Sequence, residues 1–311
     1  MKPFLFTRWA DCSTLLRAPR FGGQALILLT ISLFTPLFAA SPQFSSGVSV
    51  VEVYAAATDA QGNPVTGLRR EDFTVLEDGA PQTVSTFAEA DFPLSVALAI
   101  DRSFSMAQRN AGSRPTFVSS VAAARTFIGE LRPVDEAMIV GIGSEIEILA
   151  PLSTDRAEQL GVLAALKPWG TTGLHDAIIA SIDAIQAAKG RRALVLLSDG
   201  NDRYSKASAA VALERARRSD VMIYPVAIGR DRPALFAELA TLTGGRSFQP
   251  RDAAALDVTM RTIANELRHQ YLLGYTPAKP IAAGEERWRT IAVRVARPGV
   301  NVRSRDGYLA K

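Results

Sequence analysis

The stretch "LSVALAIDRSFSMAQRN" at residues 94–110 decides the fold of this chain. A nearly continuous apolar run ends at Asp101, and two serines follow at alternate positions, Ser103 and Ser105. Such a run is typical of a strand that is buried on both faces, as in a parallel sheet. The polar residues after it predict either a turn that caps a helix or the first part of a metal site.

The chain around this stretch alternates between strands and helices. Further strands are predicted within 136–153, 191–198 and 221–229, and helices within 114–131, 155–166, 173–189, 205–219, 232–245 and 254–270. Strands that alternate with helices of this length form β-α-β crossovers. Residues 93–268 are therefore predicted to be an α/β domain with a doubly wound, mainly parallel sheet flanked by helices.

Two segments of β character lie on either side of this domain, at 45–92 and 269–311. In the first, "EDGAP" at 77–81 is typical of a hairpin turn between two alternating runs. In the second, the runs 286–296 and 299–304 flank "RPG" and are predicted to form another hairpin. We expect both segments to form one small β-sandwich-like domain, into which the α/β domain is inserted.

Residues 1–40 have the pattern of a targeting segment. Basic residues precede the apolar run "GGQALILLTISLFTPLFAA" at 22–40, which ends in small residues. This order predicts a secretory signal peptide, although the run is also just long enough for an uncleaved membrane anchor. Either alternative places the rest of the chain outside the cytoplasm, as a secreted, periplasmic or cell-envelope protein.

Charge and cysteine content exclude several classes of function. Residues 41–311 carry 31 basic and 30 acidic residues, so the case for a nucleic-acid partner is weak. The single cysteine, Cys12, lies in the targeting segment. The remainder therefore has no disulfide, thiol nucleophile or thiolate metal ligand.

Small oxygen donors follow predicted strands or open predicted helices at three places in the chain. They are Asp101, Ser103 and Ser105 in the first place, Thr171 and Thr172 in the second, and Asp199 in the third. In an open doubly wound sheet, ligands bind beyond the carboxyl ends of the strands. Carboxylates and hydroxyls without histidine or cysteine suit a hard cation, Mg²⁺, Mn²⁺ or Ca²⁺.

These residues resemble the von Willebrand factor A domain and its metal-ion-dependent adhesion site. That family has D-x-S-x-S, then a threonine at the start of a later helix, then an aspartate after a later strand. The resemblance covers about residues 94–268 and implies that Ser103, Ser105 and Thr172 contact the ion, with Thr171 the less favoured threonine. It also implies that Asp101 and Asp199 bind the ion directly or through water.

The flanking segments look like the ends of a bacterial secreted family related to the von Willebrand factor A domain. Two residues of the metal loop depart from the family pattern, because many members have threonine and glycine where this chain has Arg102 and Phe104. Arg102 is expected to repel a cation. Phe104 is expected either to strain the loop or to add an apolar contact on the binding face.

Trp169, the two histidines and the Asn201–Asp202 pair have two interpretations each. Trp169 either packs under the threonine loop or faces a partner. His175 and His269 have no other histidine or cysteine nearby in the sequence, which favours surface or capping roles over metal binding. Asn201 and Asp202 are read as a solvated loop in preference to further ligands.

Sequence motifs of enzymes are missing. The chain has neither G-x-S-x-G nor a phosphate-binding G-x-x-x-x-G-K-[ST] loop. We therefore expect no enzyme but an adhesion or complex-assembly module, whose divalent cation, Mg²⁺ above all, binds an acidic group of a partner protein. The alternatives are a structural or assembly protein with a degenerate metal site and, less favoured, a metal-dependent hydrolase.

Overall fold

The computed structural model describes residues 50–89, 92–107, 116–229, 231–282 and 284–311. The predicted targeting segment, residues 1–40, lies outside the described residues, so neither its cleavage nor its use as an anchor is tested. None of the helices in the described ranges combines the length and the apolar character needed to cross a bilayer.

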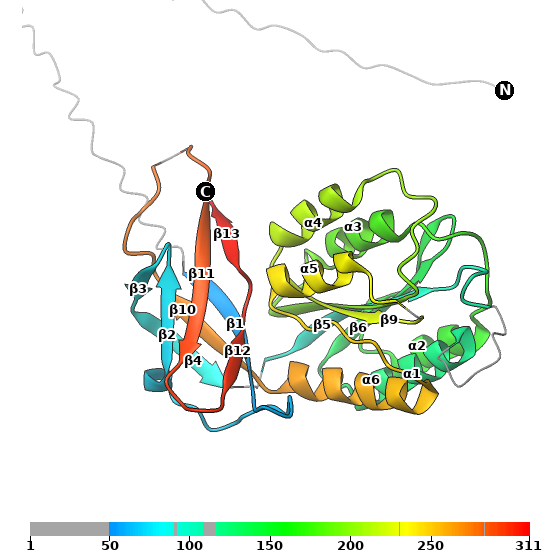
Figure 1. The fold of residues 1–311 in the computed structure, drawn as a ribbon, viewed down its shortest axis with the longest axis horizontal. Coiled ribbons are helices and arrows are strands. Elements are labelled where there is room, and N and C mark those ends of the chain that lie inside the picture. Colours follow the sequence, from blue (N-terminus) through cyan, green and yellow to red (C-terminus); the bar gives the residue numbers. More distant parts are fainter. Residues whose placement is uncertain (1–49, 90–91, 108–115, 230, 283) are drawn as a thin grey trace, which may run out of the picture. The chain divides into compact units, whose positions relative to one another are not determined.

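A five-stranded sheet forms the centre of the α/β region (Figure 1). Its order is β7-β6-β5-β8-β9, and only the edge strand β7 runs antiparallel to its neighbour. The bounds are β5 Leu94–Asp101, β6 Glu136–Ile142, β7 Ile146–Ser153, β8 Arg191–Ser198 and β9 Val221–Ala227. The chain leaves β5 toward β6 on one side and later returns to β8 on the other. The strand order therefore reverses between β5 and β8, where such sheets bind their ligands.

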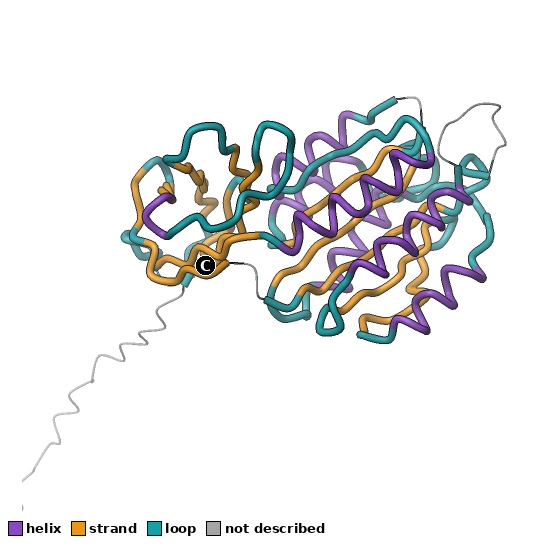
Figure 2. The backbone as a smooth tube through the Cα atoms, turned by 90° about the horizontal axis from the view of Figure 1, so that it is seen from below, coloured by secondary structure: helices purple, strands orange, loops and turns teal. Residues whose placement is uncertain are grey.

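Helices cover both faces of this sheet, and Figure 2 shows them lying over its strands. One face carries α1 (Phe117–Glu130), α2 (Arg156–Ala165) and α6 (Ala253–Arg268); the other carries α3 (Leu174–Ile185), α4 (Ala209–Arg217) and α5 (Ala234–Thr243). Alternate residues of β5 point to opposite faces, so Leu98 packs in the first core and Ala99 in the second. This arrangement confirms the predicted α/β fold class.

The remaining strands form two antiparallel sheets of four strands each, ordered β12-β1-β10-β4 and β13-β11-β2-β3. The bounds are β1 Val51–Thr58, β2 Phe73–Glu77, β3 Ala80–Gln82, β4 Val84–Glu89, β10 Gln270–Tyr275, β11 Arg287–Val295, β12 Asn301–Arg303 and β13 Gly307–Ala310; a short 3-10 helix, Arg70–Asp72, precedes β2. Side chains of both sheets, such as Val53, Val75 and Leu273, share one apolar core. Strands from both ends of the described chain thus make the predicted β-sandwich.

One of the two predicted hairpins is confirmed and the other is wrong. β2 and β3 are joined by Asp78 and Gly79, whose φ angles of 49° and 78° suit the tight turn of a hairpin. The runs around "RPG" do not pair with each other, because β11 pairs with β2 and β13, whereas β12 pairs with β1 of the opposite sheet. The chain crosses between the sheets here, and Val302 joins the sandwich core.

Candidate metal centre

The carboxyl ends of β5 and β8 place Asp101 beside Ser198. The two strands are parallel, with Ile100 paired to Leu197, so the next residues along each strand are neighbours. Asp101 is completely buried. It accepts hydrogen bonds from the Ser103 amide (2.9 Å) and from the Ser198 hydroxyl (2.7 Å). Sequence reasoning missed Ser198, whose only signal is its position directly before Asp199.

The surroundings of Asp101 disfavour its charged form. Burial raises the pKa of Asp101, hydrogen bonds from Ser103 and Ser198 oppose this effect, and the nearby charge of Asp199 raises it further. In the described part of the chain neither carboxylate has an ion pair with a basic side chain. The site therefore holds two interacting carboxyl groups that have no basic ion-pair partner among the described residues.

The two predicted serines follow on the same tight turn. Their hydroxyl oxygens lie 3.0 Å apart, and Ser103 is buried whereas Ser105 is exposed. The Met106 amide donates to the Ser103 carbonyl (3.0 Å), which closes the turn. The alternation of the D-x-S-x-S pattern thus brings a carboxylate and two hydroxyls together at the end of β5.

Backbone hydrogen bonds connect the three predicted loops. The Trp169 amide donates to the Arg102 carbonyl (2.6 Å), and the Phe104 amide donates to the Gly170 carbonyl (3.1 Å). The Thr172 carbonyl accepts from the amides of residues 203 and 204 in the loop after Asp199, at 2.9 and 3.0 Å. The three loops therefore lie together at the carboxyl ends of the parallel strands.

The two threonines have different surroundings. Thr172 is buried at the start of α3, while Thr171 is exposed and its hydroxyl lies 3.3 Å from that of Ser144. Within the described ranges, no hydrogen bond joins the Thr172 side chain to the carboxylates or serine hydroxyls of the candidate site. The structure brings the Thr172 loop to the site but forms no direct contact through its hydroxyl.

Arg102, which was expected to repel a cation, is directed elsewhere. Its guanidinium group lies 2.7 Å from the carboxylate of Glu147 and 5.0 Å from the ring centre of Trp169. Trp169 also packs on Gly143, where a β-carbon would lie only 2.8 Å from the indole ring. Trp169 thus packs against the loop that holds Gly143, as the first interpretation predicted, and it is 41% exposed, so its contact with a partner stays a prediction.

Two further aromatic side chains lie on the loops of the site. Phe104 is 60% exposed, and Tyr204, which sequence reasoning missed, is 62% exposed. Phe104 therefore has most of its ring at the surface.

Asp202 and His175 stabilise the start of α3. Asp202 accepts hydrogen bonds from the Leu174 amide (2.7 Å) and the Ser205 hydroxyl (2.5 Å). His175 Nδ1 lies 3.5 Å from the Asp202 carboxylate and 3.1 Å from the Ala207 carbonyl. Asp202 thus caps the amino end of α3, a role that the interpretation as a solvated loop did not include, whereas His175 is half-buried against Asp202 and a loop carbonyl and caps no helix in the described part of the chain.

The types of donor atoms at the site indicate which metal ions suit it. Among the described residues, no group of three or more His, Cys, Asp or Glu side chains is arranged to hold a metal ion. The candidate site has two carboxylates, and hydroxyls are its other donors. This composition fits a hard cation that keeps part of its water shell, as Mg²⁺ does, and does not fit zinc or copper.

Comparisons with known proteins agree with this fold. The model of the von Willebrand factor type A domain matches residues 96–201. A von Willebrand factor type A structure from Catenulispora acidiphila is 14% identical, with a TM-score of 0.52 over 86% of this chain and 75% of that one. Proximal thread matrix protein 1 from the mussel byssus is 13% identical, with a TM-score of 0.51 over 62% of this chain and 51% of that one.

A third solved structure, an aerotolerance-related membrane protein from Bacteroides fragilis, is 17% identical, with a TM-score of 0.48 over 57% of this chain and 98% of that one. No curated protein matches the chain. Residues 96–201 thus match the von Willebrand factor type A domain, and the chain has the α/β fold of that domain with antiparallel sheets added from its terminal segments.

Proposed function

We propose that this chain is a non-enzymatic protein-binding module that works outside the cytoplasm. The donors that would hold a divalent cation, Mg²⁺ above all, are Asp101, Ser103, Ser105, Thr172 and Asp199. When bound, the cation supplies a coordination position for an acidic side chain of the partner protein. Adhesion and complex assembly are the two processes that such a module serves.

The observation that carries this proposal is the pair of carboxylates, Asp101 and Asp199, which has no basic ion-pair partner in the described part of the chain. Buried charged groups in proteins are paired or bind metal ions, because an unpaired buried charge strongly destabilises the fold. Asp101 is completely buried, and Asp199 raises its pKa further. A divalent cation bound at this site would stabilise the charged form of Asp101 against burial and against the charge of Asp199.

The surface around the site supports a protein partner. Phe104, Trp169 and Tyr204 are exposed on the three loops that meet at the site. Exposed aromatic side chains are enriched in protein interfaces, where they supply much of the binding energy. The Arg102 guanidinium group, paired with Glu147, stacks on the Trp169 ring and holds that ring in place on the surface.

Calorimetric titration with Mg²⁺, Mn²⁺ and Ca²⁺ tests the cation site. We expect saturable binding to the full chain and its loss in Asp101→Ala and Asp199→Ala. Asp183→Ala is the matched control, because Asp183 is a surface aspartate paired with Arg215 on the helices of one face. Binding that persists in both site variants, or no binding to the unchanged protein, would contradict the proposal.

Affinity capture from the source envelope then tests the partner, with Mg²⁺ in one arm and a chelator in the other. We expect the captured protein in the Mg²⁺ arm only. A partner that is retained equally in chelator would support the alternative of an assembly protein with a degenerate site. A screen of phosphatase and esterase substrates with added metal checks the hydrolase alternative, and we expect no turnover.

A further inference from the structure

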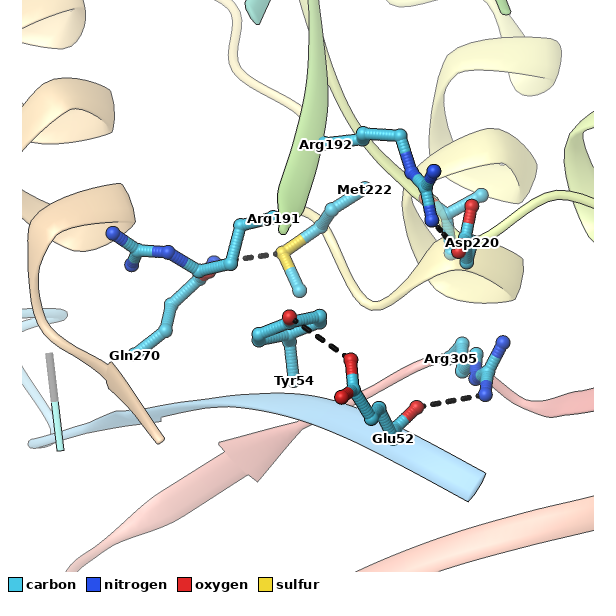
Figure 3. A pocket seen from close by; sticks show the side chains of 9 residues that line it. Glu52, Tyr54, Arg191, Arg192, Asp220, Met222, Gln270 and Arg305 are labelled. Atoms are coloured by element: carbon cyan, nitrogen blue, oxygen red, sulfur yellow. Dashed lines mark hydrogen bonds and ion pairs between the residues drawn. The ribbon is translucent and has the colours of Figure 1, made fainter. Parts of the chain in front are cut away.

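A second polar site lies at the opposite end of the central strands from the candidate metal centre. A pocket of about 40 Å³ lies at the amino ends of β8 and β9, where β1 and the loop between β12 and β13 pack against them. Its lining consists of Glu52, Tyr54, Arg191, Arg192, Asp220, Met222, Thr243, Gln270 and Arg305 (Figure 3). Seven residue steps of β8, about 23 Å, separate Arg191 from Ser198 at the candidate metal centre.

The lining carries more positive than negative charge. Three arginines face two acidic residues, Glu52 and Asp220, and Arg192 forms an ion pair with Asp220. Figure 3 shows Asp220 between the side chains of Arg192 and Arg305, and its charge also acts on Arg305. One positive charge therefore remains without a counter-charge in the pocket.

Two of these arginines are held by carbonyl groups instead of carboxylates. Arg191, which is 2% exposed, donates to the carbonyls of Phe92 (2.6 Å) and Leu267. Arg305 donates to the backbone carbonyl of Glu52 at 2.8 Å. In the described part of the chain no acidic side chain forms an ion pair with either of them. Burial lowers the pKa of Arg191 and Arg305, as expected where a cation lacks compensation.

Each of the three guanidinium groups also has an unused donor. The Nε atoms of Arg191, Arg192 and Arg305 are buried and have no hydrogen-bond partner in the described part of the chain. A buried donor without an acceptor destabilises a protein, because it has lost its hydrogen bonds to water. Arg191 and Arg192 are consecutive residues of β8 and point to opposite sides, as Figure 3 shows, so the unused donors that one ion can share are those of Arg192 and Arg305, which both lie near Asp220.

We propose that this pocket binds a small inorganic oxyanion of the phosphate or sulfate type. Guanidinium groups are the preferred protein partners of such ions, because their planar forks donate two parallel hydrogen bonds. The pocket has several times the space that one water molecule needs, which suits a small ion. The Tyr54 hydroxyl, which donates to the Glu52 carboxylate at 3.3 Å, also lines the pocket.

The bound ion would join the β-sandwich to the α/β region. Glu52, Tyr54 and Arg305 belong to the sandwich, whereas Arg191, Arg192 and Asp220 belong to β8 and the start of β9. The 303–306 segment already binds this region, because the Asp306 amide donates to the Leu242 carbonyl and the Arg303 guanidinium donates to the Gly245 carbonyl. An ion that binds arginines from both sides raises the stability of the folded chain.

Thermal unfolding and calorimetric titration of the full chain test this proposal. The probes are sodium phosphate and sodium sulfate, with sodium chloride at matched ionic strength as the reference. We expect a saturable rise in Tm and a saturable heat of binding with at least one of the two oxyanions. A rise in Tm that chloride reproduces, or the absence of saturable binding to the unchanged protein, would overturn the proposal.

Arg305→Gln and Arg305→Lys locate the ion. We expect affinity to fall at least tenfold in Arg305→Gln, and to fall in Arg305→Lys as well, because lysine keeps the charge but loses the planar fork. Arg251→Gln, at a 90% exposed side chain, removes the same charge far from the pocket and is expected to bind like the unchanged protein. Equal loss in Arg251→Gln and Arg305→Gln would show a general charge effect and refute the site.

Discussion

Two buried carboxylates of this protein, Glu77 in the β-sandwich and Asp101 in the α/β region, have opposite surroundings. Glu77 lies 2.6 Å from the Arg289 guanidinium group and accepts hydrogen bonds from Tyr275 (2.7 Å) and Tyr308 (2.8 Å). Asp101 has two uncharged donors and a second carboxylate nearby. Both side chains are at least 95% buried.

This difference separates a structural role from a binding role. The charge of Glu77 is balanced within the protein, and its partners come from β10, β11 and β13, so it fixes the strands of both sheets. The charge of Asp101 has no basic partner among the described residues, and under the proposed function a cation from solution balances it. Functional sites are where proteins retain such unfavourable arrangements, at some loss of stability.

The largest effect is expected from Arg289→Met in the sandwich. Removal of one partner of a buried ion pair leaves the other charge uncompensated, so the free energy of unfolding should fall by about 3–5 kcal/mol. Chemical denaturation measures this change. Arg287→Met is the control on the same strand, since Arg287 is 71% exposed and 3.9 Å from Asp78, and should change stability by about 1 kcal/mol or less. Equal effects of both substitutions would show that the Glu77–Arg289 ion pair does not stabilise the fold.

Asp135 provides a third buried carboxylate, with a pH test. Burial raises the pKa of Asp135, but hydrogen bonds from Arg132 and the Leu94 amide outweigh this and lower it below its usual value. A lowered pKa in the folded state adds stability above the unfolded pKa of about 3.9, and this stability is lost as the pH falls through the folded value.

Asp135→Asn should therefore lower the free energy of unfolding at pH 7 by about 2 kcal/mol. The difference from the unchanged protein should become smaller as the pH falls below about 4. Denaturation curves recorded between pH 7 and pH 2.5 measure it. A difference that stays constant over this range would show that the charge of Asp135 contributes nothing.

Asp101→Asn should raise the free energy of unfolding, whereas Asp135→Asn should lower it. The amide keeps the shape of the side chain but removes a buried charge beside Asp199, so the cation-free protein should become more stable by about 1 kcal/mol. The same variant should no longer bind divalent cations. Denaturation in chelator and calorimetric titration measure the two effects, with Asp183→Asn as the surface control. Lower stability together with unchanged cation binding would place Asp101 with Glu77 as a structural carboxylate.

The smallest effect on stability is expected from Phe104→Ser. A ring that is 60% exposed contributes little to the core, so the free energy of unfolding should change by less than about 0.5 kcal/mol. Cation binding should be unchanged, whereas capture of the partner should weaken. Phe127→Ser, in the buried core of α1, is the contrasting substitution and should unfold the protein. Loss of cation binding in Phe104→Ser would instead show that the ring supports the metal loop.

The sequence predicted the ends of the central strands well. The apolar runs that lead to Asp101 and Asp199 are buried on both faces, and such runs identify themselves by composition. The sequence did not predict Ser198 as a donor to Asp101, because that contact depends on β5 and β8 being neighbours, although 97 residues separate the two side chains. The wrong hairpin around "RPG" has the same cause, since local turn residues do not determine which sheet a strand joins.

The sequence by itself determined the elements of this protein and the order of the candidate metal donors, because strand burial, helix caps and turns are local properties of the chain. Only the tertiary structure decided that Arg102 is directed toward Glu147 and that one pocket is lined by Arg191, Arg192 and Arg305. These side chains carry charge, and their partners lie far away in the sequence. The pairing of these charges depends on which surfaces the packed sheets and helices bring together, and no local sequence pattern predicts it.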